Sequence, residues 1–183
     1  KGTSSWKFRK KTDLMPDRAF QVLLLEDDAA HATAVRRALE EANPSSTLRV
    51  APTRESFLRQ LEEAPSDVAL LDLNIPGGRS LDLLPVIRSL RNTPVIILTS
   101  QGDEGTAVKA IKGGAMDYLV KSPEAFAELP RSIARALREW QLIREHRQAQ
   151  EQLQVTLEKY RVLFDMFPLG VAVTDSQGKI VEL

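Results

Sequence analysis

Strand-length apolar runs alternate with helix-length amphipathic segments from Phe20 to Val120, and this alternation restricts the chain to one class of fold. The apolar runs suit strands that are buried on both faces, and the segments between them carry apolar residues at helical spacing. Strands joined by helical crossovers run parallel, so the sequence predicts an α/β fold with a five-stranded parallel sheet covered on both faces. The strands are expected at residues 21–25, 47–51, 67–71, 94–98 and 117–120, and the helices at 29–42, 54–63, 80–90, 104–112 and from 123 onward.

Polar residues stand where four of these strands end. Glu26 and Asp27 follow the first strand, Asp72 the third, Thr99 the fourth and Lys121 the fifth. Open α/β sheets place their chemistry in the crevice at the carboxyl ends of the strands, so these side chains are expected around one crevice. Taken alone, Asp72 is equally well explained as a residue that turns the chain. The other strand ends favour a shared site.

The expected cluster of Glu26, Asp27 and Asp72 has a definite chemistry. Carboxylates held close together repel one another unless a cation compensates their charge, and oxygen ligands of this kind suit Mg²⁺. A compensated carboxylate can attack phosphorus and form an aspartyl phosphate, whose oxygens an ammonium such as Lys121 and a hydroxyl such as Thr99 would stabilise. The chain has no glycine-rich nucleotide loop. A phosphoryl acceptor that uses a small donor or a phosphoprotein is therefore favoured over an ATP-using enzyme.

Residues 20–137 resemble a response-regulator receiver domain of two-component signalling. The resemblance is carried by the acidic pair Glu26-Asp27, the stretch Asp72-Leu-Asn74-Ile-Pro76, Thr99 with its small neighbour Ser100, Tyr118 and Lys121. It implies a flavodoxin-like (CheY-like) fold, with Asp72 as phosphoacceptor and a histidine kinase or phosphotransfer protein as partner. It also implies that Thr99 and Tyr118 form the switch, and that Mg²⁺ is held by Asp27, Asp72 and the carbonyl of Asn74, with Glu26 acting through water.

Two departures from the family pattern concern the local backbone. Ser122 separates Lys121 from Pro123, where proline usually follows the lysine directly, and Ser80 stands where the family has glycine. Neither change removes a reacting group. The alternative is a receiver-like dimerisation scaffold that works without phosphorylation. A phosphatase with an Asp72 nucleophile is a third reading, disfavoured because such enzymes use a second aspartate where this chain has Asn74.

Composition narrows the classes of function further. The 25 basic and 25 acidic residues balance, and no helix-turn-helix pattern follows the receiver, so nothing indicates nucleic-acid binding. The absence of cysteine excludes disulfides and thiolate chemistry, and two histidines do not make a histidine-rich zinc site. Apolar runs of strand length and the lack of a secretory signal pattern predict a cytoplasmic protein that does not cross a membrane.

The last receiver helix is expected to continue into a signalling linker. Residues 131–160 contain neither glycine nor proline, although Pro130 is a candidate break or restart. Steps of three and four connect Ile143, His146, Gln150, Leu153, Leu157, Tyr160 and Phe164. Such a heptad seam predicts a two-stranded coiled coil and a homodimer, the alternative being a solvated helix with a few apolar residues.

The remaining segments complete the predicted organisation. Two apolar alternations around Asp-Ser-Gln-Gly near the C-terminus predict a β-hairpin and resemble the opening of a PAS domain. We expect a basic tail at 1–19, a receiver domain at 20–137, a helical linker at 138–163 and a truncated PAS-like start at 164–183. This order is typical of proteins that end in a histidine kinase or a cyclic-dinucleotide enzyme. The 183-residue chain itself would be a phosphoryl acceptor with at most slow autodephosphorylation.

Overall fold

The computed structural model describes residues 19–76, 78–102, 104–166, 173–174, 177 and 179–182. Its central element is a five-stranded sheet of order β2-β1-β3-β6-β7 in which all neighbouring strands are parallel. The strands are β1 (Gln21–Leu25), β2 (Thr47–Ala51), β3 (Val68–Asp72), β6 (Val95–Thr99) and β7 (Asp117–Val120). The chain moves outward in one direction from β1 to β2 and in the other from β3 onward, which is the flavodoxin-like order. The predicted fold is confirmed.

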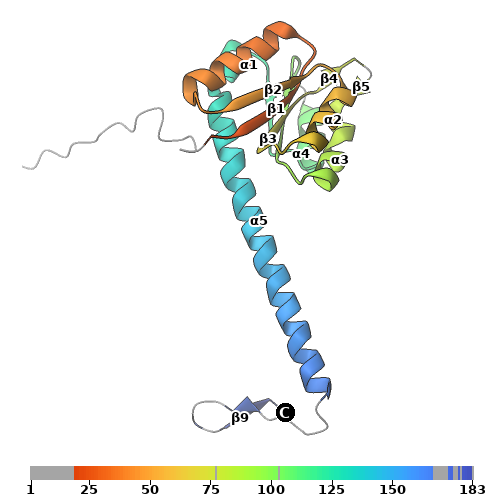
Figure 1. Cartoon of the computed structure of the whole chain (residues 1–183), viewed down its shortest axis with the longest axis vertical. Helices are drawn as coiled ribbons and strands as arrows, with labels where there is room; N and C mark the ends of the chain where they lie inside the picture. Colours follow the sequence, from red (N-terminus) through yellow and green to blue (C-terminus); the bar gives the residue numbers. More distant parts are fainter. Residues whose placement is uncertain are drawn as a thin grey trace, which may run out of the picture. The chain divides into compact units, whose positions relative to one another are not determined.

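Helices cover both faces of this sheet (Figure 1). They are α1 (Ala29–Ala42), α2 (Arg54–Glu63), α3 (Leu83–Leu90), α4 (Glu104–Lys112) and α5 (Pro123–Met166). Side chains alternate along β1, so that Leu23 joins the core under α2, α3 and α4, whereas Leu24 joins the core under α1 and the first part of α5. Burial on both faces explains why the strands read as continuous apolar runs.

The third crossover differs from its prediction. A helix was expected over residues 80–90, but the segment begins as a 3-10 helix, Ser80–Asp82, before α3. The Ser80 side chain is buried and its hydroxyl has no hydrogen-bond partner among the described residues, so it does not cap a helix. A short antiparallel pair, β4 (Asn74–Ile75) with β5 (Gly78–Arg79), precedes it. Strands of two residues show no sequence period and were not expected.

The end of α4 and the start of α5 follow ordinary capping rules. Gly114, with φ 98°, takes the left-handed conformation after α4. Ser122 caps α5, since its hydroxyl accepts a hydrogen bond from the N–H of Ala125 at 3.1 Å and Pro123 occupies the first helical position. Helix α5 continues through Pro130, so this proline does not break the helix.

The chain divides into two compact units, with the boundary between Trp140 and Gln141 inside α5. In the second unit, β8 (Val173–Thr174) pairs antiparallel with β9 (Ile180–Glu182), which confirms the predicted hairpin pairing for the described residues. Most of the predicted basic tail and several residues of the predicted PAS-like segment lie outside the described residues. Among the helices that are described, none has both the length and the apolar character needed to cross a bilayer.

Candidate functional site

Four of the predicted site residues lie at one edge of the sheet. Glu26 directly follows β1, Asp72 is the last residue of β3, Thr99 is the last residue of β6 and Lys121 directly follows β7. These four strands are neighbours and run in the same direction, so their carboxyl ends meet. The structure therefore brings the predicted acids and the predicted lysine together.

Three carboxylates form the centre of the site. Glu26, Asp27 and Asp72 each offer an oxygen that lies within 4.8 Å of the others. Glu26 and Asp72 are buried, whereas Asp27 is exposed. One oxygen of Asp72, Oδ1, accepts a hydrogen bond from the backbone N–H of Asn74 at 3.2 Å. The strand end thus presents a nearly buried carboxylate beside two further acids.

Lys121 is the cation that faces this cluster. Its Nζ lies 2.7 Å from Glu26 Oε2 and 2.8 Å from Asp72 Oδ2, and its side chain is 3% exposed. One ammonium opposes three acidic groups, so the site keeps an excess of negative charge. Glu26 Oε2 is in the ion pair but has no aligned hydrogen-bond donor. A set of carboxylate oxygens with uncompensated charge fits a hard divalent cation such as Mg²⁺.

The predicted switch residues meet at a single backbone carbonyl. The hydroxyl of Thr99 donates to the carbonyl oxygen of Gln101 at 2.8 Å, and the hydroxyl of Tyr118 lies 3.4 Å from the same oxygen. A hydroxyl has one proton, so Thr99 does not donate to Asp72 in this arrangement. The structure brings Thr99 and Tyr118 together through Gln101, a residue that the sequence did not single out.

His31 is a further member of the site that sequence reasoning missed. Its Nδ1 lies 3.2 Å from Lys121 Nζ and 3.3 Å from Glu26 Oε1. Asp28 places it there by capping α1: its carboxylate accepts from the N–H groups of Ala30 at 2.7 Å and of His31 at 3.2 Å. These backbone donors, His31 first, lower the pKa of Asp28. The Asp28 cap is the sequence signal that could have placed this histidine beside the strand ends.

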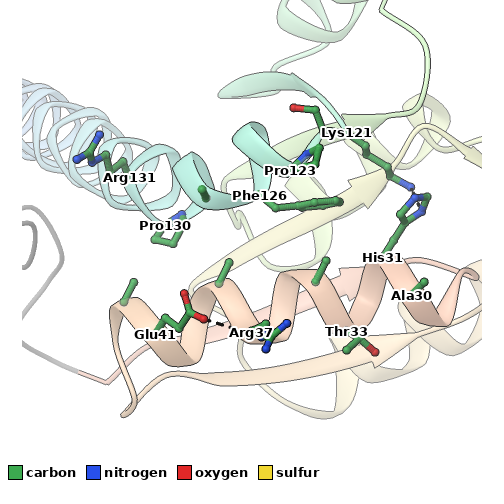
Figure 2. A pocket seen from close by; sticks show the side chains of 15 residues that line it. Ala30, His31, Thr33, Arg37, Glu41, Lys121, Pro123, Phe126, Pro130 and Arg131 are labelled. Atoms are coloured by element: carbon green, nitrogen blue, oxygen red, sulfur yellow. Dashed lines mark hydrogen bonds and ion pairs between the residues drawn. The ribbon is translucent and has the colours of Figure 1, made fainter.

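A groove leads from the surface to this part of the site. It has a volume of about 840 Å³ and runs between α1 and the start of α5. Figure 2 shows Phe126 and Pro130 on the α5 side, Arg37 and Glu41 on α1, and His31 beside Lys121 at one end. Small side chains of α1, such as Ala34, leave the space open. Lys121 therefore lines one end of a surface groove.

Comparison with known proteins finds similar sequences for this part of the chain. The family model described as response regulator receiver domain matches residues 22–134. The methanogenesis regulatory protein FilR1 of Methanothrix harundinacea is 40% identical over 126 residues, which is 67% of this chain and 28% of that protein. The two-component response regulator PhoP of Pseudomonas aeruginosa is 33% identical over 119 residues, 64% of this chain and 52% of that protein. The chain thus matches about a quarter to a half of the length of these curated relatives.

Solved structures show the same fold. The beryllofluoride-activated NtrC4 receiver domain dimer superposes with a TM-score of 0.58 at 29% identity, covering 66% of this chain and 98% of that chain. A CheY-like receiver domain protein of Methanospirillum hungatei gives a TM-score of 0.59 at 24% identity, over 68% of this chain and 98% of that chain. The second likeness concerns the fold alone.

Proposed function

The chain belongs to the response regulator receiver family, and from this membership we propose that it accepts a phosphoryl group on Asp72. The observation that carries the proposal is the position of Asp72, which is buried at a strand end between an acidic pair and the Lys121 ammonium. A histidine kinase or phosphotransfer protein would be the natural donor. The groove between α1 and α5 gives such a partner a surface next to the site.

The transfer proceeds by nucleophilic attack. An oxygen of Asp72 attacks the phosphorus of a phosphohistidine, a P–O bond forms, and the P–N bond breaks. The bonding pair leaves with the imidazole nitrogen, which takes a proton from solvent. Lys121 already lies against Asp72 Oδ2, so a short movement of its ammonium would place it on a phosphoryl oxygen.

The acidic cluster supplies the metal site that this chemistry needs. Asp27 and Asp72 would hold Mg²⁺ together with the backbone carbonyl of Asn74, and Glu26 would act through water. When bound, the ion offsets the negative charge of the carboxylates and of the incoming phosphoryl group. Asp27, the exposed member of the cluster, stands on the open side of the site.

The phosphorylated state would be read out through Gln101. A phosphoryl oxygen on Asp72 is a stronger acceptor than a backbone carbonyl, so Thr99 would turn its hydroxyl from Gln101 towards it. The carbonyl of Gln101 would then keep only the hydroxyl of Tyr118, 3.4 Å away in the present structure. With one donor in place of two, the Gln101 carbonyl would be held less firmly and would be free to move together with Tyr118.

We propose that the signal passes along α5 of a homodimer to a PAS domain and an output domain. Supporting observations are the helix Pro123–Met166, the antiparallel pair β8–β9, and the dimer formed by the NtrC4 receiver domain. The proposed segments are a basic tail at 1–19, the receiver at 20–137, a coiled-coil linker at 138–163 and the start of a PAS-like domain at 164–183.

Intact mass after incubation with acetyl phosphate and Mg²⁺ tests the acceptor. The unmodified chain should gain about 80 Da, one phosphoryl group, and Asp72→Asn should gain nothing. Asp82→Asn, which changes an exposed aspartate of the neighbouring 3-10 helix, is the matched control and should gain the same mass. A folded chain that takes up no phosphoryl group from either acetyl phosphate or a phosphohistidine protein would point to the scaffold instead.

A further inference from the structure

The second half of α5 carries three columns of residues at a spacing of seven, and the middle one is shared by two seams. The shared column contains His146, Leu153 and Tyr160. One flanking column contains Ile143, Gln150, Leu157 and Phe164, and the other contains Leu142, Ala149, Thr156 and Leu163. The shared column and the first flanking column together form the first seam. The shared column and the second flanking column together form the second seam. Each seam has the alternating three and four spacing of a coiled coil.

Both seams are available for packing. The leucine, isoleucine and aromatic members of the three columns are 43–66% exposed. Thr156, the polar member of the second flank, donates its hydroxyl to the carbonyl of Gln152 within the helix at 2.8 Å, so its polar group is already satisfied. Gln150 is the polar member of the first flank. Each seam therefore combines large apolar residues with a weaker central position.

We propose that two copies of the chain pair in parallel through α5 and that the pair has two alternative registers, one for each seam. This inference rests on the proposed function, because the receiver is what would bias the choice. Adjacent flanking residues such as Leu142 and Ile143 lie about 100° apart around a helix, so moving the contact from one seam to the other turns each helix by about 50°. The change is a rotation and requires no bending.

A second copy is the occupant that the charge pattern allows. In the first register of a parallel pair, Arg147 and Arg161 face Leu142 and Thr156 of the second copy. In the second register, Glu145 and Lys159 face Gln150 and Phe164 of the second copy. Neither register brings like charges together at these flanking positions. A repeat of seven maintained in all three columns is the period of helix-on-helix packing.

Neither seam is apolar throughout, so each register has a weak position that the other avoids. The first flank adds three large apolar residues and the polar Gln150, whereas the second adds Leu142 and Leu163 with the smaller Ala149 and Thr156. Interfaces that differ little in free energy respond to a small differential interaction, since only the difference between the states shifts their populations. Phosphorylation of Asp72 would provide that difference.

Single cysteines distinguish the registers, because the chain contains no cysteine of its own. Leu157→Cys reports the first register and Thr156→Cys the second, while Val155→Cys lies outside both seams and is the control. Two thiols close a disulfide only when their Cα atoms approach within about 7 Å. In a glutathione redox buffer, we expect dimer cross-links in both reporter variants and few in the control.

Two further substitutions should bias the ratio of the reporters in opposite directions. Gln150→Leu strengthens the first seam and should raise the ratio of Leu157→Cys to Thr156→Cys cross-links by about threefold or more, since a buried leucine replaces a polar residue. Ala149→Leu strengthens the second seam and should lower the same cross-link ratio by a similar factor. Cross-links in one reporter alone, with no response to Gln150→Leu or Ala149→Leu, would overturn the proposal of two registers. A tetramer in light scattering would do so too, because it buries both flanks at once.

Acetyl phosphate and Mg²⁺ then test the switch in the same samples. The reporter ratio should change with Asp72 present and stay constant in the Asp72→Asn background. Phosphoryl uptake by mass with an unchanged ratio would overturn the switch and leave the acceptor function standing. No uptake would overturn the acceptor function, and the bias substitutions would still decide whether two registers exist.

Discussion

Replacing Lys121 with methionine removes the ammonium that pairs with the buried carboxylates of Glu26 and Asp72. Among the described residues, the one other basic group in an ion pair with either of them is His31, at the rim of the site. At 2.7 and 2.8 Å and an effective dielectric constant of about 20, each ion pair contributes roughly 6 kcal/mol of attraction. Desolvation of the ammonium offsets much of this sum. Breaking a buried pair leaves an uncompensated charge, and the expected net loss for Lys121→Met is about 3 kcal/mol.

Thermal unfolding measures this loss. For a receiver of this size, about 3 kcal/mol corresponds to a decrease in Tm of roughly 10 °C in buffer with EDTA. Lys112→Met, at an exposed position in the last turn of α4, is the control and should change stability by no more than about 0.5 kcal/mol. A Lys121→Met variant that unfolds within about 2 °C of the unmodified chain would show that the carboxylates do not depend on this ammonium.

Magnesium separates charge compensation from packing in the same variant. If the deficit is electrostatic, a divalent cation among Glu26, Asp27 and Asp72 replaces part of the lost charge. Mg²⁺ should therefore raise the Tm of Lys121→Met by more than it raises the Tm of the unmodified chain, and EDTA should reverse the gain. Equal increases in the two proteins would mean that the deficit is a packing defect. NaCl at the same ionic strength is the control, because Ca²⁺ would itself bind the carboxylate oxygens.

Three further changes have expected outcomes. Gly114→Ala should cost about 1 kcal/mol or more in chemical denaturation, because φ is 98° and the new Cβ would clash with the guanidinium of Arg88. The pKa of Glu124 lies below its ordinary 4.5, owing first to its own backbone N–H and then to the Ser122 hydroxyl. Glu124→Gln should therefore lower the Tm at pH 7, and the difference should disappear as the pH falls below the lowered pKa. His31→Ala should slow phosphoryl uptake from acetyl phosphate without changing the far-ultraviolet circular dichroism, because Lys121 loses a neighbour at 3.2 Å; an unchanged rate would refute a positioning effect.

The sequence predicted the positions of the site residues better than their contacts. Apolar runs that are buried on both faces place Asp72 and Thr99 at strand ends, and parallel pairing brings those ends together. The proximity of these two residues therefore follows from the topology of the sheet. The partner of the Thr99 hydroxyl depends on a rotamer and on the loop at Gln101, and neither leaves a period in the sequence. His31 was missed for a similar reason, since its position depends on the cap that Asp28 forms.

The serine between Lys121 and Pro123 shows how a departure from the family pattern can be accommodated. The backbone beside the lysine is regular, because Ser122 caps α5: its hydroxyl accepts from Ala125 N–H at 3.1 Å and its carbonyl from Phe126 N–H at 3.0 Å. Lys121 itself is held from the strand side, where its N–H donates to the carbonyl of Thr99 at 2.7 Å. The residue that would bind the phosphoryl group is thus followed directly by a helix cap. A displacement of its backbone would reach the first turn of α5 with no flexible residue between, which suits the proposed rotation of α5.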